Sequence, residues 1–365
     1  MVNQPSSNAS PLSKFSEAIA YAQSHEVSWP RDPAADPAGW GVHHADPPPF
    51  NRLRGPVHAR GGVSGVIRVA GKEVASWGEP DRADLTFSVA KTYLALLAGV
   101  AQARGLLDPR QRIAERLPGI GFDDAHNREI TWAHMLEQTS EWGGTCLGMP
   151  DQVEHHRHVS HDPKPPQGRK GEARVLQPPG SYWEYNDVRI NQLALALLHL
   201  FRRPLPEVFM ETVLQPLGGG ENFRWVGYDD AWVDIDGQRM QSVPGGTHWG
   251  GGVSISARDQ ARIAQLLLNG GVHEGRALLP AGWIALMQRP CAIAPFYGWL
   301  VWLNQGGAMF ADASRQSWFM VGAGGHYVWI DPVHDAVVVV RWLDPARSPG
   351  FVTRVARALE AGARR

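Results

Sequence analysis

Cysteine and lysine are both scarce in this chain of 365 residues. Its two cysteines, Cys146 and Cys291, are too few for a disulfide framework, so we expect two free thiols. Five of the 35 basic residues are lysines and the rest are arginines. The net charge is −1 and no basic stripe or lysine-rich tract occurs, which argues against nucleic acid as a partner.

Long apolar runs are missing as well. No apolar stretch reaches the roughly 18 residues that a membrane span requires, so we expect no membrane partner. Residues 1–11 are polar and rich in Ser, Asn and Pro, without the basic segment and apolar run of a secretory signal. We therefore expect a cytoplasmic protein, and nothing in the sequence fixes its oligomeric state.

Several chemical signatures are absent too. No His-Glu-x-x-His, phosphate-binding loop or Gly-x-Ser-x-Gly elbow occurs, so the sequence implies no metal and no cofactor. A histidine cluster lies in segment 143–180, but no carboxylate or cysteine spacing supports a metal site there. We interpret the segment as one long solvated loop, the alternative being a loop that covers the active site. The clustered histidines are His155, His156, His158 and His161.

What the chain does contain is enough length to bury a large core in one composite domain or two interleaved ones. A hairpin at 65–69 and 73–77 followed by a buried helix indicates the start of an α/β body. Further strands are expected at 297–303, 318–323, 327–330 and 336–342. Helices are expected at 13–24, 88–104, 131–140, 188–200, 205–217, 257–268 and 352–361.

The most informative stretch begins at Leu85, where a strand end is expected to turn into a helix. Ser88 stands in the first turn and Lys91 three residues later. This spacing places both side chains on one helical face, about 5 to 6 Å apart at Cβ, so the lysine can hold or receive the serine proton. The N–H groups at the helix N-terminus can stabilise an oxyanion.

The Ser-x-x-Lys spacing alone is weak evidence. With 19 serines and five lysines, one chance occurrence is expected in about one such sequence of four. The alternative is a helix-capping Ser88 and a solvated Lys91. Residues 94–100 are apolar on all faces of the expected helix, as in a buried helix, which favours the catalytic interpretation.

Five segments in fixed order resemble the β-lactamase-related serine hydrolases, which include class C β-lactamases, D,D-peptidases, family VIII esterases and 6-aminohexanoate-dimer hydrolase. The first contains Ser88 and Lys91, and the third contains Tyr185 ahead of an apolar helix. The resemblance covers most of the chain between residues 60 and 345. The segments are 87–92, 130–140, 179–187, 250–270 and 322–326, the last lying ahead of Asp331-Pro332.

The resemblance implies a fold in the α/β class, of the α+β type. Helices flank a central, mainly antiparallel sheet, and a mainly helical subdomain is inserted. The implied α/β body comprises residues 51–110 and 240–365. The implied helical subdomain is 111–239, including the loop 143–180, and residues 1–50 form an N-terminal arm that is partly disordered.

The resemblance also implies Ser88 as the acylated nucleophile, Lys91 as its proton partner and Tyr185 as general base and acid. The oxyanion hole would consist of the backbone N–H groups of Ser88 and Ala323. A serine, a lysine and a phenol form a proton relay without histidine, because a lysine cation stabilises a phenolate.

Two departures from the family pattern concern the substrate. The usual Tyr-x-Asn is here Tyr185-Asn186-Asp187, so either Asp187 places an anion near the Lys91 ammonium or Asn186 contributes the amide. The usual Lys-Thr-Gly or His-Thr-Gly is replaced by Gly322-Ala323-Gly324, which offers no cation to a substrate carboxylate. We therefore expect neutral esters to be better substrates than β-lactams, unless a protonated His326 replaces the missing cation.

Aromatic residues near the motifs are candidate cleft walls that would favour apolar substrate groups. His248 precedes the glycine run 250–252 and is a further candidate for the pocket, with a structural role as the alternative. His134 is expected to be a core or surface residue. The candidate aromatic wall residues are Trp142, Trp183, Trp249 and Trp318.

Three functions are consistent with these patterns. The first is a hydrolase of small carboxylic esters or amides that acts through an acyl-serine intermediate. The second is a β-lactamase or D,D-peptidase, which the missing cation and missing export signal argue against. The third is a catalytically silent binding protein of the same fold, which the presence of Ser88, Lys91 and Tyr185 together argues against.

Overall fold

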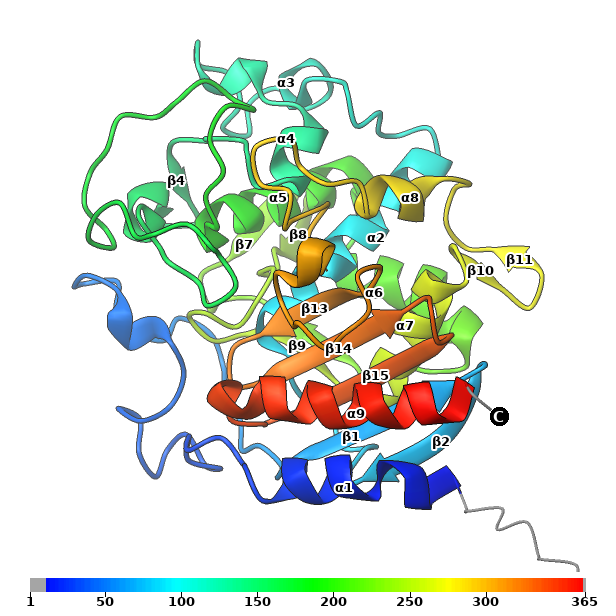
Figure 1. Cartoon of the computed structure of the whole chain (residues 1–365). Helices are drawn as coiled ribbons and strands as arrows, with labels where there is room; N and C mark the ends of the chain where they lie inside the picture. The colour runs from blue at the N-terminus through cyan, green and yellow to red at the C-terminus, as the bar shows by residue number, and fades with distance from the viewer. Residues whose placement is uncertain (1–10, 364–365) are drawn as a thin grey trace, which may run out of the picture.

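The centre of the fold is a six-stranded antiparallel sheet (Figure 1). The computed structural model describes residues 11–363. The strand order is β12-β13-β14-β15-β1-β2, and every neighbouring pair is antiparallel. The strands are β1 (Ser64–Val69), β2 (Lys72–Trp77), β12 (Trp302–Leu303), β13 (Trp318–Gly322), β14 (His326–Asp331) and β15 (Ala336–Arg341).

Alternating apolar residues give this sheet two buried faces. Val66 pairs with Val339, and both pack into the core that contains helix α7 (Ala257–Leu268). Their neighbours Ile67 and Val338 point to the opposite face. Helices α1 (Pro11–Gln23) and α9 (Ser348–Ala363) cover that face and lie side by side in Figure 1.

Helix α2 (Ala90–Ala103) lies at the centre of the second, mainly helical half and is buried from Ala90 to Ala101. It packs against two other helices of this half, α5 and α6. This burial confirms the expectation drawn from its apolar faces. The other helices are α3 (Ile113–Arg116), α4 (Trp132–Leu136), α5 (Asp187–Phe201), α6 (Leu205–Phe209) and α8 (Trp283–Met287).

A small sheet leads the chain into α2. Its order is β3-β9-β6, formed by β3 (Asp84–Leu85), β9 (Gly252–Ile255) and β6 (Arg224–Val226). The glycine run thus enters a strand, as expected, next to the strand end that precedes Ser88. The remaining strands form hairpins: β4 (Thr145–Cys146) with β5 (Met149–Pro150), β7 (Trp232–Ile235) with β8 (Gln238–Gln241), and β10 (Val272–His273) with β11 (Arg276–Ala277).

The predicted fold class, antiparallel sheet flanked by helices, is confirmed. Several element boundaries differ. The strand expected at 297–303 is reduced to β12 because Leu300 turns the chain with a φ of 54°. The helix expected at 205–217 is α6 followed by a π turn and a 3-10 turn. The helix expected at 13–24 begins at Pro11, so the disorder that we expect for residues 1–12 does not hold for residues 11 and 12, and residues 1–10 lie outside the described residues.

Three smaller expectations can also be compared with the structure. Both cysteines are free and buried, as expected. His134 accepts at Nδ1 from the backbone N–H of Thr131 and so takes part in the cap of α4, a structural role. Among residues 11–363, no helix combines the length and apolar character of a membrane span.

Candidate active site

Ser88 lies in a 3-10 turn, Phe87–Val89, that connects β3 to α2. It therefore precedes the α-helix by one turn instead of lying inside it. Phe87 has a φ of 51°, a left-handed conformation that costs a non-glycine residue about 1–3 kcal/mol. Its ring packs against Trp29 and Trp40, with centroids 5.3 and 5.7 Å away. This packing holds the strained turn and thereby fixes the position of Ser88.

Lys91 is the direct partner of Ser88. Its Nζ donates a hydrogen bond to Ser88 Oγ at 2.7 Å, and the lysine is only 1% exposed. Lys91 Nζ also forms an ion pair with Asp187 Oδ1 at the start of α5. The structure thus brings together the serine, the lysine and the anion that the motif spacing suggested.

Tyr185 lies beside the same lysine. Lys91 Nζ is 4.8 Å from the centroid of the Tyr185 ring, and Arg157 Cζ is 5.1 Å from it. Two cations therefore flank one phenol, an arrangement that stabilises negative charge developing on its oxygen. Trp302 stacks on the ring at 5.7 Å.

Ser88 and Tyr185 share one cavity of about 280 Å³. Ala323 lies on its wall, at the end of β13. Gly322 permits this approach, because a Cβ at that position would clash with the carbonyl oxygen of Thr86. The β13 end therefore abuts the nucleophile turn. This arrangement is compatible with an oxyanion hole formed by the N–H groups of Ser88 and Ala323, which stays a prediction.

Asp187 is the hub of a buried ion-pair network. Besides Lys91, it contacts Arg157 Nη1 at 2.6 Å and His248 Nδ1 at 3.0 Å, both through Oδ2. Burial by itself would raise the pKa of Asp187, but the charges of Arg157 and Lys91 and the His248 contact hold it well below its usual range. Asp187 is therefore an anion at neutral pH.

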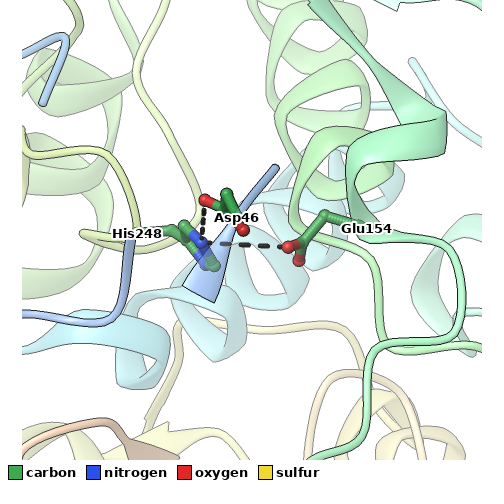
Figure 2. Close-up of side chains that lie close together, drawn as sticks. All are labelled: Asp46, Glu154 and His248. Carbon is green, nitrogen blue, oxygen red and sulfur yellow. Dashed lines mark hydrogen bonds and ion pairs between the residues drawn. The ribbon is translucent and has the colours of Figure 1, made fainter. Parts of the chain in front are cut away.

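His248 connects Asp187 to Asp46 of the N-terminal arm, and Figure 2 shows its contacts with Asp46 and Glu154. Its Nε2 lies 2.8 Å from Asp46 Oδ2 and 3.8 Å from Glu154 Oε1. Because an ionised carboxylate can only accept, the contacts of both ring nitrogens require both to be protonated. Burial lowers the pKa of His248, but the Glu154 charge and the hydrogen bonds to Asp187 and Asp46 outweigh it, so the net shift is upward.

Asp46, Glu154 and His248 also have the donor set and spacing of a cation site, with ligand atoms within 4.8 Å of one another (Figure 2). The Lys170 ammonium, however, forms ion pairs with Asp46 Oδ1 and with Glu154 Oε1, the latter at 2.7 Å. Lys170 thus supplies the positive charge that a metal ion would bring. The donor chemistry fits an ion-pair network better than a metal centre.

Sequence reasoning missed most of this network, and its interpretation of segment 143–180 as one solvated loop does not hold for residues 145–154. The segment contains the β4–β5 hairpin and a 3-10 turn, and His155 is buried against Asp151, with Nε2 2.8 Å from Oδ2. Residues 157–161 line the cavity, as the alternative of a covering loop suggested. The side chains missed from the arm and this segment are Asp46, Glu154, Arg157 and Lys170.

Asn186 and Trp249 do not reach the cavity. Asn186 is fully buried, caps α5 by accepting from the N–H of Arg189 at 3.1 Å, and donates to the carbonyl of Asp151. Its role is to begin the helix, so the anion of Asp187 is what faces Lys91. Trp249 donates its indole N–H to Asp46 Oδ2 at 2.7 Å and holds the network from behind.

His326 and Gly324 lie behind the cavity wall as well. The His326 ring packs against Trp342 at 4.3 Å, and neither ring nitrogen has a hydrogen-bond partner among the described residues. Burial first, then the charges of Arg341 and Arg60, hold the pKa of His326 well below its usual range. The idea that His326 replaces the missing cation is therefore wrong.

The aromatic wall also differs from expectation. Trp302 and Tyr327 line the cavity, whereas the four tryptophans singled out from the sequence do not. Those four are buried in the hydrophobic core or behind the site: Trp142, Trp183, Trp249 and Trp318.

A second, larger cavity of about 520 Å³ lies beside β3, β6 and β9. It contains Ser254 and His58, whose Oγ and Nε2 are 3.4 Å apart. This distance is long for a hydrogen bond, and burial lowers the pKa of His58. The Ser88 cavity, with its 2.7 Å contact to Lys91, is the better candidate.

Replacing Glu154 by glutamine is expected to reduce the pH dependence of the free energy of unfolding between pH 2 and 5, the acid limb of the stability curve. Burial opposes ionisation of Glu154, but Arg157 and Lys170 lower its pKa from 4.5 to about 2. A depressed carboxyl pKa stabilises the fold above pH 4.5, and this contribution is lost as the pH falls towards 2. The difference amounts to roughly 3 kcal/mol. Urea unfolding at several pH values between 2 and 5 measures it.

The matched control is Glu221→Gln, because Glu221 is exposed. Its acid limb should coincide with that of the unchanged protein. Equal acid limbs for Glu154→Gln and the unchanged protein would contradict the assigned network.

With this geometry described, comparisons with known proteins can be added. A sequence profile of the beta-lactamase family matches residues 50–361. A 6-aminohexanoate-dimer hydrolase from Paenarthrobacter ureafaciens is 23% identical over an alignment of 308 positions, which covers 77% of this chain and 74% of that protein. The profile match extends from the end of the N-terminal arm into α9.

Solved structures share the fold at low sequence identity. A penicillin-binding protein homologue from Caulobacter crescentus has a TM-score of 0.61 at 15% identity, over 98% of this chain and 100% of that one. A D-stereospecific amidohydrolase from Streptomyces has a TM-score of 0.54 at 16% identity, over 80% and 93% of the two chains. At these identities the likeness shows the fold.

Proposed function

The chain belongs to the beta-lactamase family, and from this premise we propose that it is a serine hydrolase that cleaves small carboxylic esters or amides through an acyl-Ser88 intermediate. The observation that carries the proposal is the 2.7 Å hydrogen bond from Lys91 Nζ to Ser88 Oγ, at the wall of a cavity that also contains Tyr185. Relatives named as hydrolases and as an amidohydrolase support the reaction class.

In the proposed mechanism, Lys91 remains a cation because it is ion-paired with Asp187. Tyr185, as a phenolate between the Lys91 and Arg157 cations, accepts the Ser88 proton. Ser88 Oγ then bonds to the substrate carbonyl carbon, and the charge on the carbonyl oxygen is stabilised by N–H donors at the cavity wall.

Collapse of this tetrahedral intermediate breaks the bond to the leaving group, which takes its proton from Tyr185. Water then attacks the acyl-serine, giving one proton to Tyr185 and its hydroxyl to the acyl carbon. The acid product leaves when Tyr185 returns the proton to Ser88 Oγ. Atoms and charges balance without a cofactor.

The β-lactamase or D,D-peptidase alternative lacks a cation after β13, where residues 322–324 are Gly-Ala-Gly, and His326 at the start of β14 is buried without a hydrogen-bond partner among the described residues. The alternative of a silent binding protein predicts no covalent step. Stopped-flow mixing with p-nitrophenyl butyrate separates the proposed hydrolase from the silent binding protein. We expect a rapid release of p-nitrophenolate of up to one equivalent, followed by steady turnover. Release no faster than with Ser88→Ala would contradict the proposal.

A further inference from the structure

The charged side chains on the cavity wall are all basic. Arg157, Lys170 and His248 line the cavity together with Ser88 and Tyr185, and none of its lining residues is an aspartate or glutamate. The remaining wall is mixed, with the aromatic Trp302 and Tyr327 beside the polar side chains of His158, Ser160 and His161. A wall of this kind suits an organic anion better than a neutral or cationic substrate.

The carboxylates that balance these cations lie behind the wall. The side chains of Asp46 and Glu154 are 0% exposed and that of Asp187 is 5% exposed. None of the three lines the cavity. The anions therefore face the protein interior, where they bind the Lys170 ammonium and both ring nitrogens of His248.

The network behind the cavity wall contains more basic side chains than carboxylates. Its three anions, Asp46, Glu154 and Asp187, are contacted by Lys91, Arg157, Lys170 and a His248 that is protonated on both nitrogens. These are four cations against three carboxylates, and the Tyr185 phenolate of the proposed mechanism balances the fourth cation until it accepts the Ser88 proton.

Arg157 has hydrogen-bonding capacity to spare. Its Nη1 contacts both Glu154 and Asp187, whereas Nε and Nη2 make no hydrogen bond with the described residues. A guanidinium presents its N–H groups as a planar fork that matches a carboxylate. The second fork of Arg157 is thus free for a ligand in the cavity.

We propose that Arg157, assisted by Lys170, binds a carboxylate on the substrate's leaving group. This inference rests on the proposed function and narrows its substrate class to esters or amides whose leaving group is an organic acid. The leaving-group side is assigned because Arg157 lies over Tyr185, the proposed proton donor to the leaving group. Because Gly322-Ala323-Gly324 offers no cation, the sequence predicted a preference for neutral substrates. The proposal reverses this expectation, since Arg157 supplies a cation from another part of the chain.

The test compares two esters that differ only in charge, 4-acetoxybenzoate and 4-acetoxybenzamide, at pH 7.5. We expect kcat/KM to be about 10- to 100-fold higher for the anionic ester, the range of a charge-assisted hydrogen bond. The preference should shrink in high salt. Equal values, or a preference for the amide-bearing ester, would overturn the inference. Hydrolysis of neither ester would instead contradict the proposed function.

Variants locate the preference. Arg157→Gln should reduce the ratio of the two kcat/KM values to near one, and Lys170→Gln should reduce it partly. Arg157→Lys should keep part of it, because the charge remains while the fork is lost. Arg169→Gln is the matched control on the same segment, since Arg169 is exposed and should leave the ratio unchanged. An unchanged ratio in Arg157→Gln would remove Arg157 from the assignment.

Arg157→Gln also removes an ion-pair partner of Asp187, so the variant could lose activity towards both esters. Inhibition of the unchanged enzyme provides a second measurement. We expect 4-hydroxybenzoate to compete with the neutral ester at a Ki about 10-fold or more below that of 4-hydroxybenzamide. Equal inhibition constants would count against the proposal whatever the variant does.

Discussion

Replacing Ser88 by alanine is expected to lower kcat by about 10⁴-fold or more, because Ser88 carries the cavity hydroxyl that accepts a hydrogen bond from Lys91 Nζ. The change removes one hydroxyl and one hydrogen bond with Lys91, which costs about 1 kcal/mol of stability. Lys91 keeps its ion pair with Asp187, so the fold should persist. Steady-state hydrolysis of p-nitrophenyl butyrate and the thermal unfolding temperature measure both effects.

Ser160→Ala is the matched control, since Ser160 lines the same cavity but has no lysine partner among the described residues. It should retain kcat within a few-fold. Turnover by Ser88→Ala at the rate of the unchanged enzyme would refute the mechanism as a whole. A loss of activity accompanied by unfolding would instead show that Ser88 supports the turn at Phe87, contrary to the small stability change expected.

The second large effect is expected from the proton relay. Lys91→Ala and Tyr185→Phe should each lower the acylation rate by about 10² to 10⁴, the usual contribution of a positioned acid or base. In Lys91→Ala, Asp187 keeps Arg157 and His248 as partners, so its charge is not left uncompensated. In Tyr185→Phe, the stacking on Trp302 is kept and only the phenol oxygen is lost.

Single-turnover release of p-nitrophenolate measures the acylation rate directly. The two single variants and the double variant should show similar losses, because residues that act as one relay are not additive. Nearly full activity in either single variant would place that residue outside the relay. Fully additive losses would indicate two independent roles instead.

Local patterns in the sequence predicted a large part of the fold. The hairpin β1–β2 and helix α7 were predicted because alternation, turn residues and capping are properties of neighbouring residues. The Ser88–Lys91 pair was predicted for the same reason, since three residues of spacing fix its geometry. The position of Ser88 in a 3-10 turn was not predicted. The strained Phe87 in this turn is held by aromatic rings from distant parts of the chain.

The ion-pair network around Asp187 could not be predicted from local patterns, although His248 itself was a candidate for the pocket. Asp46, Arg157 and His248 come from three separate segments without regular spacing, and only the fold brings them together. One signal was available in retrospect. Basic residues in a long internal segment such as 143–180 need carboxylate partners if the segment packs on the body of the protein. The acidic residues of the N-terminal arm could have suggested such partners.

His326 illustrates the opposite error. Its place after the glycine motif suggested the cleft, because sequence position does not reveal the direction of a side chain at a strand start. In the structure it pairs opposite Gly322, and its ring packs on Trp342. A buried, unpaired imidazole is neutral, since ionisation without a partner in a low-dielectric site is unfavourable.

The most direct test of the central claim is the mass of the enzyme after brief exposure to p-nitrophenyl butyrate and acid quenching, followed by peptide mapping. We expect one butyryl group per chain, located on the peptide that contains Ser88 and absent from Ser88→Ala. Hydrolysis that proceeds without any adduct under rapid quenching, or an adduct on a different residue, would contradict an acyl-Ser88 mechanism.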